Sequence, residues 1–157
     1  MTAVEPWSEA RTRQIVAGHT HLEGPLMPIL HAVQEAFGMV PEAAVPVIAE
    51  ELNLSRAEVH GVVSFYHDFR REPAGKHVLK LCRAEACQAM GCESLVKRAE
   101  DRLGVDCGHT SADGRVTLEP VYCLGLCATA PSAMIDGRIV GRLDAVKLDK
   151  ILKEAGA

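Results

Sequence analysis

The chain has 157 residues, of which 48% are hydrophobic and 24% are charged. This length allows one ordinary domain or two small ones and excludes a large multidomain enzyme, and the composition excludes a disordered chain and a collagen-like or coiled-coil rod. The 17 basic and 21 acidic residues give a formal charge of -4 without any block of like charges, so nucleic acid is not an expected partner.

The sequence also contains evidence about the cellular compartment of the protein. It has no apolar run of the ~18 residues that a membrane span needs, and residues 2–13 mix charges rather than forming an apolar stretch. We therefore expect neither a membrane span nor a secretory signal. All six cysteines lie in the second half of the chain: Cys82, Cys87, Cys92, Cys107, Cys123 and Cys127. Without an export signal we expect a reducing, cytoplasmic location, which favours metal ligation or redox chemistry over a disulfide framework.

Composition divides the chain into two modules. Residues 1–74 contain no cysteine, five basic and ten acidic residues, whereas residues 75–157 contain every cysteine, twelve basic and eleven acidic residues. Pro73 and Gly75 interrupt both helix and strand patterns in a polar stretch at the junction. We therefore predict an N-terminal helical domain over residues 1–74 and a second domain over residues 75–157.

The first module has the apolar period of helices. In one segment, apolar residues recur at three- and four-residue steps: Leu26, Ile29, Leu30, Val33 and Phe37. This pattern is typical of an amphipathic helix, and Gly38 stands just past its end. Three further helices are expected, over Ser8–Ala17, from Pro41 to Asn53, and after the capping box Ser55-Arg56-Ala57-Glu58. The pattern predicts a four-helix bundle.

The second module changes to the period of strands. His77–Leu81 alternates polar with apolar residues and predicts a strand that delivers Cys82 at its end. Two helices and three short strands complete the module: helices over Glu93–Leu103 and Asp144–Ala155, and strands over Val116–Leu118 with Val121–Tyr122, Ala133–Ile135 and Arg138–Val140. This order predicts a mixed α+β or α/β fold, a small sandwich of the thioredoxin type.

Four cysteines carry the candidate chemistry. They form two short pairs, each beginning where a predicted strand ends: Cys82-x4-Cys87 and Cys123-x3-Cys127. A five-residue step separates side chains by about 140° on a helix, so we expect loops to present the thiolates, with Gly91, Gly125 and Pro131 shaping the backbone. Four thiolates suit a 2Fe-2S cluster, a tetrahedral zinc ion, redox thiols or two disulfides. Spacings longer than Cys-x2-Cys favour the cluster, because its ligands surround a larger object, but they leave zinc and redox thiols open.

Other candidate residues receive structural interpretations. Cys92 and Cys107 fall outside the paired motif, and we expect them to serve as small apolar residues. His19-x-His21 lacks an acidic or thiol companion at ligand spacing and is interpreted as a solvated loop.

Three clustered aromatic residues, Phe65, Tyr66 and Phe69, are expected to pack in the core, with a subunit contact as the alternative. No catalytic residue is predicted. The serines lack a nucleophile elbow, and no glycine-rich dinucleotide loop follows a predicted strand.

Three segments resemble the 24-kDa-type 2Fe-2S subunit family of respiratory NADH dehydrogenase. They are Val121–Pro131 (VYCLGLCATAP), Gly61–Phe69 (GVVSFYHDF) and Leu79–Gly91 (LKLCRAEACQAMG). Within the family, the third segment is most similar to the gamma subunit of the molybdenum-containing, NAD-dependent formate dehydrogenase. The respiratory subunit tends to have small hydroxylated residues and proline where this sequence has Arg83-Ala84-Glu85-Ala86. The likeness covers nearly the whole chain.

The resemblance implies an N-terminal helical bundle followed by a thioredoxin-like ferredoxin domain that binds one 2Fe-2S cluster through Cys82, Cys87, Cys123 and Cys127. It also implies partner subunits: a flavoprotein holding FMN, NAD and a further iron–sulfur cluster, and a catalytic subunit with a molybdenum cofactor that oxidises formate. The chain would then be a non-catalytic electron-transfer subunit beside that FMN.

Other assignments stay open. The chain could be the equivalent subunit of respiratory NADH dehydrogenase or of an NAD-reducing hydrogenase, or a freely diffusing shuttle ferredoxin. A zinc-binding interaction module is a more distant alternative.

Overall fold

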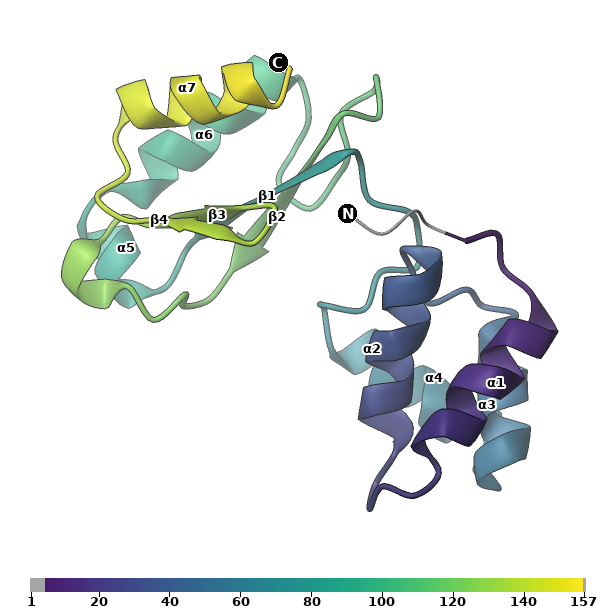
Figure 1. Cartoon of the computed structure of the whole chain (residues 1–157). Helices are drawn as coiled ribbons and strands as arrows, with labels where there is room; N and C mark the ends of the chain where they lie inside the picture. Colours follow the sequence, from purple (N-terminus) through teal and green to yellow (C-terminus); the bar gives the residue numbers. More distant parts are fainter. Residues whose placement is uncertain (1–4, 157) are drawn as a thin grey trace. The chain divides into compact units, whose positions relative to one another are not determined.

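The computed structural model describes residues 5–156 of the chain. Internal contacts divide the chain into two compact units, Met1–Pro73 and Ala74–Ala157, which we name the helical unit and the sheet unit (Figure 1). This division falls one residue before the boundary expected from composition. Each unit has an apolar core of its own.

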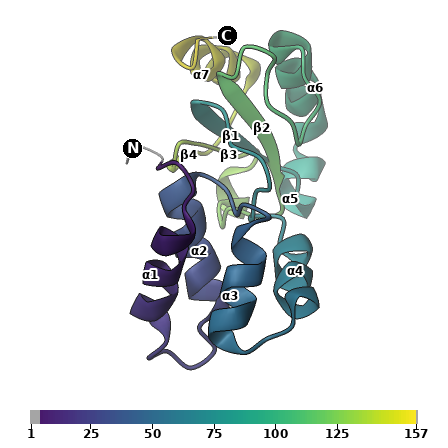
Figure 2. The same ribbon diagram turned by 90° about the vertical axis from the view of Figure 1, so that its right-hand side faces the viewer.

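The helical unit is a bundle of helices around one core (Figure 2). Helix α1 packs against α2 and α3, and α3 packs against α4. The core includes the fully buried side chains of Ile29, Leu30, Ile48 and Val59. The four helices confirm the predicted bundle: α1 (Glu9–His19), α2 (Leu26–Phe37), α3 (Ala44–Leu52) and α4 (Arg56–Phe65).

Local sequence accounts for the ends of these helices. The Ser8 side chain caps α1 by accepting a backbone N–H. Gly38 (φ 74°) and Asn53 (φ 52°) end α2 and α3 in left-handed backbone, which these two residue types adopt at low cost. The predicted start of α3 is wrong: Pro41 lies in a separate turn, in which its carbonyl accepts the N–H of Ala44 at 2.9 Å.

The predicted capping box at the start of α4 is present and gives a pH-dependent stability. The Ser55 hydroxyl accepts the Glu58 N–H at 3.2 Å, and the Glu58 carboxylate accepts the Ser55 N–H at 2.8 Å. These hydrogen bonds hold the pKa of Glu58 below its ordinary value. Their stabilisation is therefore present above the unfolded-state pKa and is lost as pH falls through the lowered folded-state pKa.

We expect Glu58→Gln to destabilise the helical unit at neutral pH, because the amide cannot supply the carboxylate charge at the helix start. The difference from the natural chain should shrink as pH falls through the lowered folded-state pKa of Glu58, where the carboxyl becomes protonated. Urea unfolding curves of both chains across this range measure the effect. A difference that stays constant with pH would contradict the assignment.

The sheet unit contains a four-stranded sheet of order β2-β1-β3-β4 among its described residues. The strands are β1 (His77–Cys82), β2 (Val116–Val121), β3 (Ala133–Ile135) and β4 (Arg138–Val140). Strand β1 pairs parallel with β2 and antiparallel with β3, which pairs antiparallel with β4. The predicted Asp136-Gly137 hairpin is confirmed, and both residues have the positive φ (50° and 85°) that its tight turn requires.

Two helices, α6 (Cys92–Leu103) and α7 (Ala145–Glu154), cover one face of this sheet (Figure 1). Leu79, Leu81 and Leu118 from the strands pack with apolar side chains of both helices in the core of the unit. The predicted helices over this part of the chain and the mixed α+β fold are confirmed. No helix within residues 5–156 is both long and apolar enough to cross a membrane.

One helix was not predicted. Helix α5 (Glu85–Ala89) lies between β1 and α6 and contains Cys87. The expectation that loops carry all four paired cysteines is therefore wrong for Cys87. It is also wrong for Cys82, the last residue of β1, and for Cys127, which begins the 3-10 turn η1 (Cys127–Thr129). Elements of three to five residues are too short to show a helical period in the sequence.

Candidate metal centre

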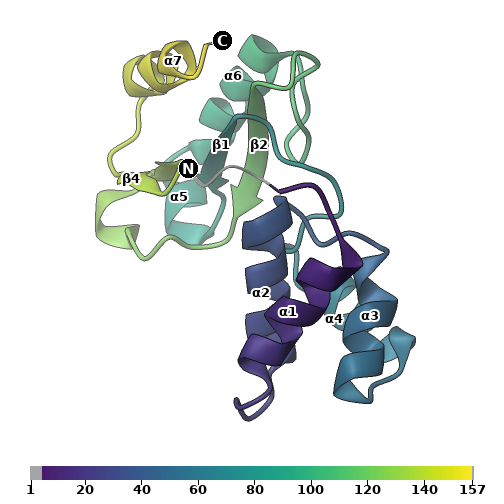
Figure 3. The same cartoon turned by 45° about the vertical axis from the view of Figure 1, so that its right-hand side comes forward.

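The two cysteine pairs come to the same end of the sheet. Cys82 ends β1, and Cys123 follows two residues after the end of β2. Because β1 and β2 are parallel and Cys82 pairs with Val121, the two segments that carry the cysteines leave the sheet at the same end, the carboxyl ends of these strands. Figures 1 and 3 show α5 and the green turn that contains η1 beside each other at this end.

The two cysteine segments pack together. Leu124, from the second segment, packs against the buried cluster of Cys82, Cys87 and Cys92. Burial acts to raise the pKa of Cys82, but the polar groups around its sulfur, among them the backbone N–H groups of Ala84, Leu124 and Cys123, outweigh it, and the net effect is a lowered pKa. The first and second segments therefore meet at Cys82.

The two sulfur atoms of the second pair also lie close to each other. The sulfur atoms of Cys123 and Cys127 lie 3.6 Å apart, and the interaction with Cys123 raises the pKa of Cys127. Thiolates gathered at this distance repel one another, and a bound cationic metal centre offsets that repulsion. The arrangement therefore suits metal ligation better than four isolated thiols.

The two pairs differ in exposure. Cys82 and Cys87 are each 2% exposed, whereas Cys123 and Cys127 are exposed. One side of the centre is therefore shielded from water and the other lies at the surface. All six cysteines lie in the described part of the chain and all are free thiols there.

Left-handed backbone shapes the second segment. Cys123 has φ 105° and Gly125 has φ 76°, and the Gly125 N–H donates to the sulfur of Cys123 at 3.3 Å. An added Cβ at Gly125 would meet no atom within 4 Å, so a substitution there tests the backbone conformation alone.

We expect Gly125→Ala to destabilise the sheet unit by about 1–2 kcal/mol, the cost of left-handed backbone for a residue with a Cβ. Gly61→Ala is the matched control. Gly61 lies inside α4 and also has open space around an added Cβ, so alanine there should stabilise the helical unit by about 0.5–1 kcal/mol. Thermal unfolding of the two variants measures both changes in stability. Equal changes in the two variants would contradict a cost from left-handed backbone at Gly125.

Contacts around Arg83 fix the first cysteine segment. Its guanidinium binds both carboxylate oxygens of Glu93 at 3.0 and 2.8 Å. Its backbone N–H donates to the carbonyl of Val121 at 2.8 Å, and its carbonyl accepts the side-chain amide of Gln88 at 2.9 Å. The segment is thereby tied to α6, β2 and α5, and a two-pronged ion pair of this kind adds geometric specificity.

The remaining cysteines fit their predicted apolar interpretation. Cys92 is 3% exposed and clusters with Cys82 and Cys87, and Cys107 is half-buried against the core of the sheet unit. Burial raises the pKa of both thiols, which keeps them protonated and unreactive at neutral pH.

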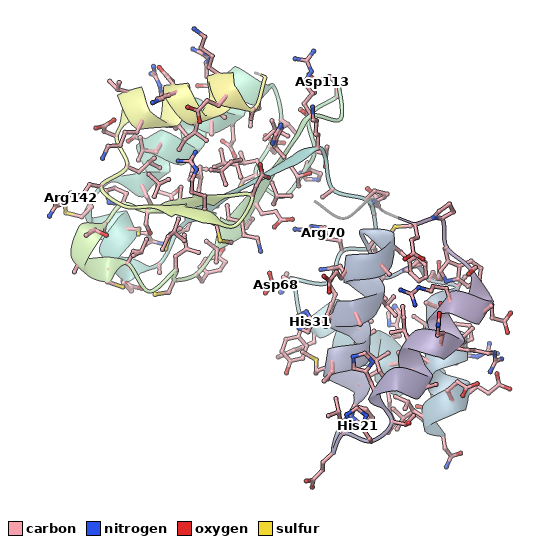
Figure 4. The ribbon with its side chains drawn as sticks, in the orientation of Figure 1. His21, His31, Asp68, Arg70, Asp113 and Arg142 are labelled. Atoms are coloured by element: carbon pink, nitrogen blue, oxygen red, sulfur yellow. The ribbon has the colours of Figure 1, made fainter. Side chains whose placement is uncertain are left out.

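The two histidines of the His19-x-His21 motif lie in different elements. His19 ends α1, where its Nδ1 atom lies 2.8 Å from the Ile15 carbonyl oxygen, and His21 lies in the turn beyond (Figure 4). The interpretation as a solvated loop is therefore wrong for His19. Among residues 5–156, no three His, Cys, Asp or Glu side chains are placed to hold a single metal ion.

The predicted core packing of the aromatic cluster holds only for Phe69. Its ring is 5% exposed and lies 4.9 Å from the ring of His31, which Figure 4 labels. Phe65 and Tyr66 are 72% and 45% exposed and make an edge-to-face contact at 5.1 Å. Helix α4 ends at Phe65, so Tyr66 lies beyond the helix and does not pack in the core.

Comparison with known proteins shows the family. Residues 12–156 match the thioredoxin-like [2Fe-2S] ferredoxin family. One NADH-quinone oxidoreductase subunit of Pseudomonas aeruginosa is 40% identical over 132 residues, which are 82% of this chain and 80% of that protein. The HndA subunit of the NADP-reducing hydrogenase of Solidesulfovibrio fructosivorans is 33% identical over 141 residues, 90% of this chain and 82% of that protein.

A solved structure shares the fold. A chain of NAD+-reducing [NiFe]-hydrogenase in the air-oxidized state matches 83% of this chain with a TM-score of 0.70 and 25% identity. This chain spans 22% of the length of that hydrogenase chain. The family match covers both units and includes the four paired cysteines. The chain therefore belongs to the thioredoxin-like [2Fe-2S] ferredoxin family.

Proposed function

We propose that this chain is an electron-transfer subunit of an NAD-linked oxidoreductase and that Cys82, Cys87, Cys123 and Cys127 bind its 2Fe-2S cluster. The observation that carries the proposal is the meeting of the two cysteine pairs at one end of the sheet. There, Leu124 from the second segment packs against the buried Cys82 and Cys87 of the first. Membership of a 2Fe-2S family supports the choice of cluster.

The donor set fits this group. Four thiolates in two pairs suit a 2Fe-2S cluster, which is bound by four cysteines. When bound, the cluster supplies a site that takes up and releases one electron at a time. The buried pair keeps water from one side, and the exposed pair presents the other side to a partner.

We propose a flavoprotein subunit that binds FMN and NAD as this partner. The relatives are named as oxidoreductases or hydrogenases that act on NADH, NADP or NAD+. Hydride transfer to a nicotinamide moves two electrons, whereas a 2Fe-2S site moves one. A flavin that handles both kinds of step is therefore needed in the same assembly. The cytoplasm is the proposed location, because six free thiols are typical of a reducing compartment.

The proposed assembly is a formate dehydrogenase whose third subunit carries a molybdenum cofactor. The resemblance of Leu79–Gly91 to the gamma subunit of that enzyme supports this choice. The segment has a structural role of its own, since Arg83 binds Glu93 and Glu85 begins α5. A second candidate is the equivalent subunit of NADH dehydrogenase or of a hydrogenase, which the 40% and 33% identical relatives favour.

Purification of the tagged chain from its natural host, without oxygen, tests the proposal. We expect co-purification of a flavoprotein and a molybdenum-containing subunit, with formate-dependent reduction of NAD. A nickel-containing partner, or NADH oxidation coupled to quinone without formate activity, would assign the second candidate instead. A chain that carries iron but no flavoprotein partner would be a shuttle ferredoxin, and a chain that carries zinc would contradict both.

A further inference from the structure

Ser132 is a buried polar residue whose surrounding sequence has no nucleophile elbow and predicts no role for it. It lies between η1 and β3 and is 2% exposed. Its hydroxyl oxygen is 3.6 Å from the sulfur of Cys87, which is also 2% exposed. Within residues 5–156, that sulfur is the only hydrogen-bond partner found for this hydroxyl. A buried hydroxyl is therefore directed at one of the four proposed ligands.

The backbone around Ser132 fixes this position. The Ser132 carbonyl accepts the N–H of Cys82 at 3.0 Å, and the next residue, Ala133, pairs with Leu81 across β3 and β1. The same residue thus contacts Cys82 through its backbone and Cys87 through its side chain. These backbone contacts hold Ser132 in place and limit the movement of its hydroxyl away from the sulfur.

The chemistry of ligation determines the direction of the hydrogen bond. With a free thiol at Cys87, either atom can donate. A metal-bound cysteine is a thiolate without a proton, so the Ser132 hydroxyl is then the only possible donor. A hydrogen bond donated to a ligand sulfur stabilises added negative charge, and the burial of both groups strengthens it.

We propose that Ser132 is a positioning residue that donates a hydrogen bond to the sulfur of Cys87 and thereby raises the reduction potential of the cluster. The inference rests on the ligand assignment made above. Another donor to one of the four sulfurs is the backbone N–H of Gly125 on Cys123, which a side-chain change cannot remove. Ser132 is a described position at which a side-chain change can adjust the potential without replacing a ligand.

Ser132→Ala tests the role, with Ser111→Ala as the matched control. Ser111 is a buried serine of the same unit, 8% exposed, whose hydroxyl bonds to Asp113 and to the Val116 N–H rather than to sulfur. We expect Ser132→Ala to retain iron and to lower the equilibrium constant for one-electron reduction by up to about tenfold, about 59 mV. Ser132→Thr, which keeps the hydroxyl, should restore most of the shift, and Ser111→Ala should cause none.

Redox titration of each purified, iron-loaded protein, followed by its visible spectrum, measures these potentials. An unchanged potential in iron-loaded Ser132→Ala would overturn the inference and leave the proposed function intact. A natural chain without iron and sulfide would instead remove the proposed function, and this inference with it.

If Ser132→Ala does not retain iron, pulsed EPR of the reduced natural protein decides the question. The hydroxyl proton should give a hyperfine coupling that disappears within minutes of transfer to heavy water, whereas buried amide protons exchange slowly. The absence of a rapidly exchanging coupled proton would overturn the inference.

Discussion

Replacement of Cys87 by serine is expected to reduce the iron retained by the purified protein by more than about tenfold. Loss of a group that merely orients a metal ligand already costs about 10–100-fold in affinity, and here the ligand itself is removed. Cys87 is 2% exposed inside α5, so no external thiol can take its place readily. Serine substitutions at Cys82, Cys123 and Cys127 should act in the same way.

The chain offers matched controls for this result. Cys107→Ser changes a half-buried thiol outside the paired motif, and Cys92→Ala removes a buried thiol that touches Cys82 and Cys87 without being a proposed ligand. Both variants should keep their iron and visible spectrum. Iron loss in Cys107→Ser as severe as that in Cys87→Ser would show that the ligand set is wrongly assigned.

Leu118→Ala is expected to destabilise the sheet unit by about 2–5 kcal/mol, the range for a leucine truncated in a packed core. Leu118 is 0% exposed in the core beneath α6 and α7. Ile48→Ala should cost a similar amount in the separate core of the helical unit, where Ile48 is also 0% exposed. The two variants therefore test whether the units unfold separately.

Two probes distinguish the units in a urea titration. The single tryptophan, Trp7, lies in the helical unit, so its fluorescence reports that unit, while visible absorption reports the cluster. Leu118→Ala should shift the absorption transition and leave the fluorescence transition in place, and Ile48→Ala should do the reverse. Ile139→Ala, at a side chain 55% exposed, should change either transition by less than about 0.5 kcal/mol. Coincident shifts of both probes would show one cooperative unit instead.

Sequence alone predicts elements whose signals are local. Gly38, Asn53 and Gly104 each end a helix with positive φ, and one residue type is enough to indicate that conformation. Ser55 and Glu58 form their capping box within four residues. The pairing of the cysteine segments could also be anticipated, because each cysteine pair begins where a predicted strand ends.

Features that depend on tertiary context were missed or misjudged. Strand β2 runs through Pro120, which is tolerated because β2 is an edge strand, a fact that the sequence does not contain. Tyr66 is exposed where α4 has already ended, and Phe65 is exposed although it lies inside α4. Ser132 carries no motif, and only the approach of η1 and β3 to α5 places its hydroxyl beside Cys87.

Iron and acid-labile sulfide analysis of the anaerobically purified natural chain, combined with EPR after dithionite reduction, tests the assigned chemistry most directly. We expect two iron atoms and two sulfides per chain, as the family's [2Fe-2S] centre requires, and a paramagnetic signal that appears only on one-electron reduction. Stoichiometric zinc, or a chain without iron that sustains the activity of its complex, would contradict the account.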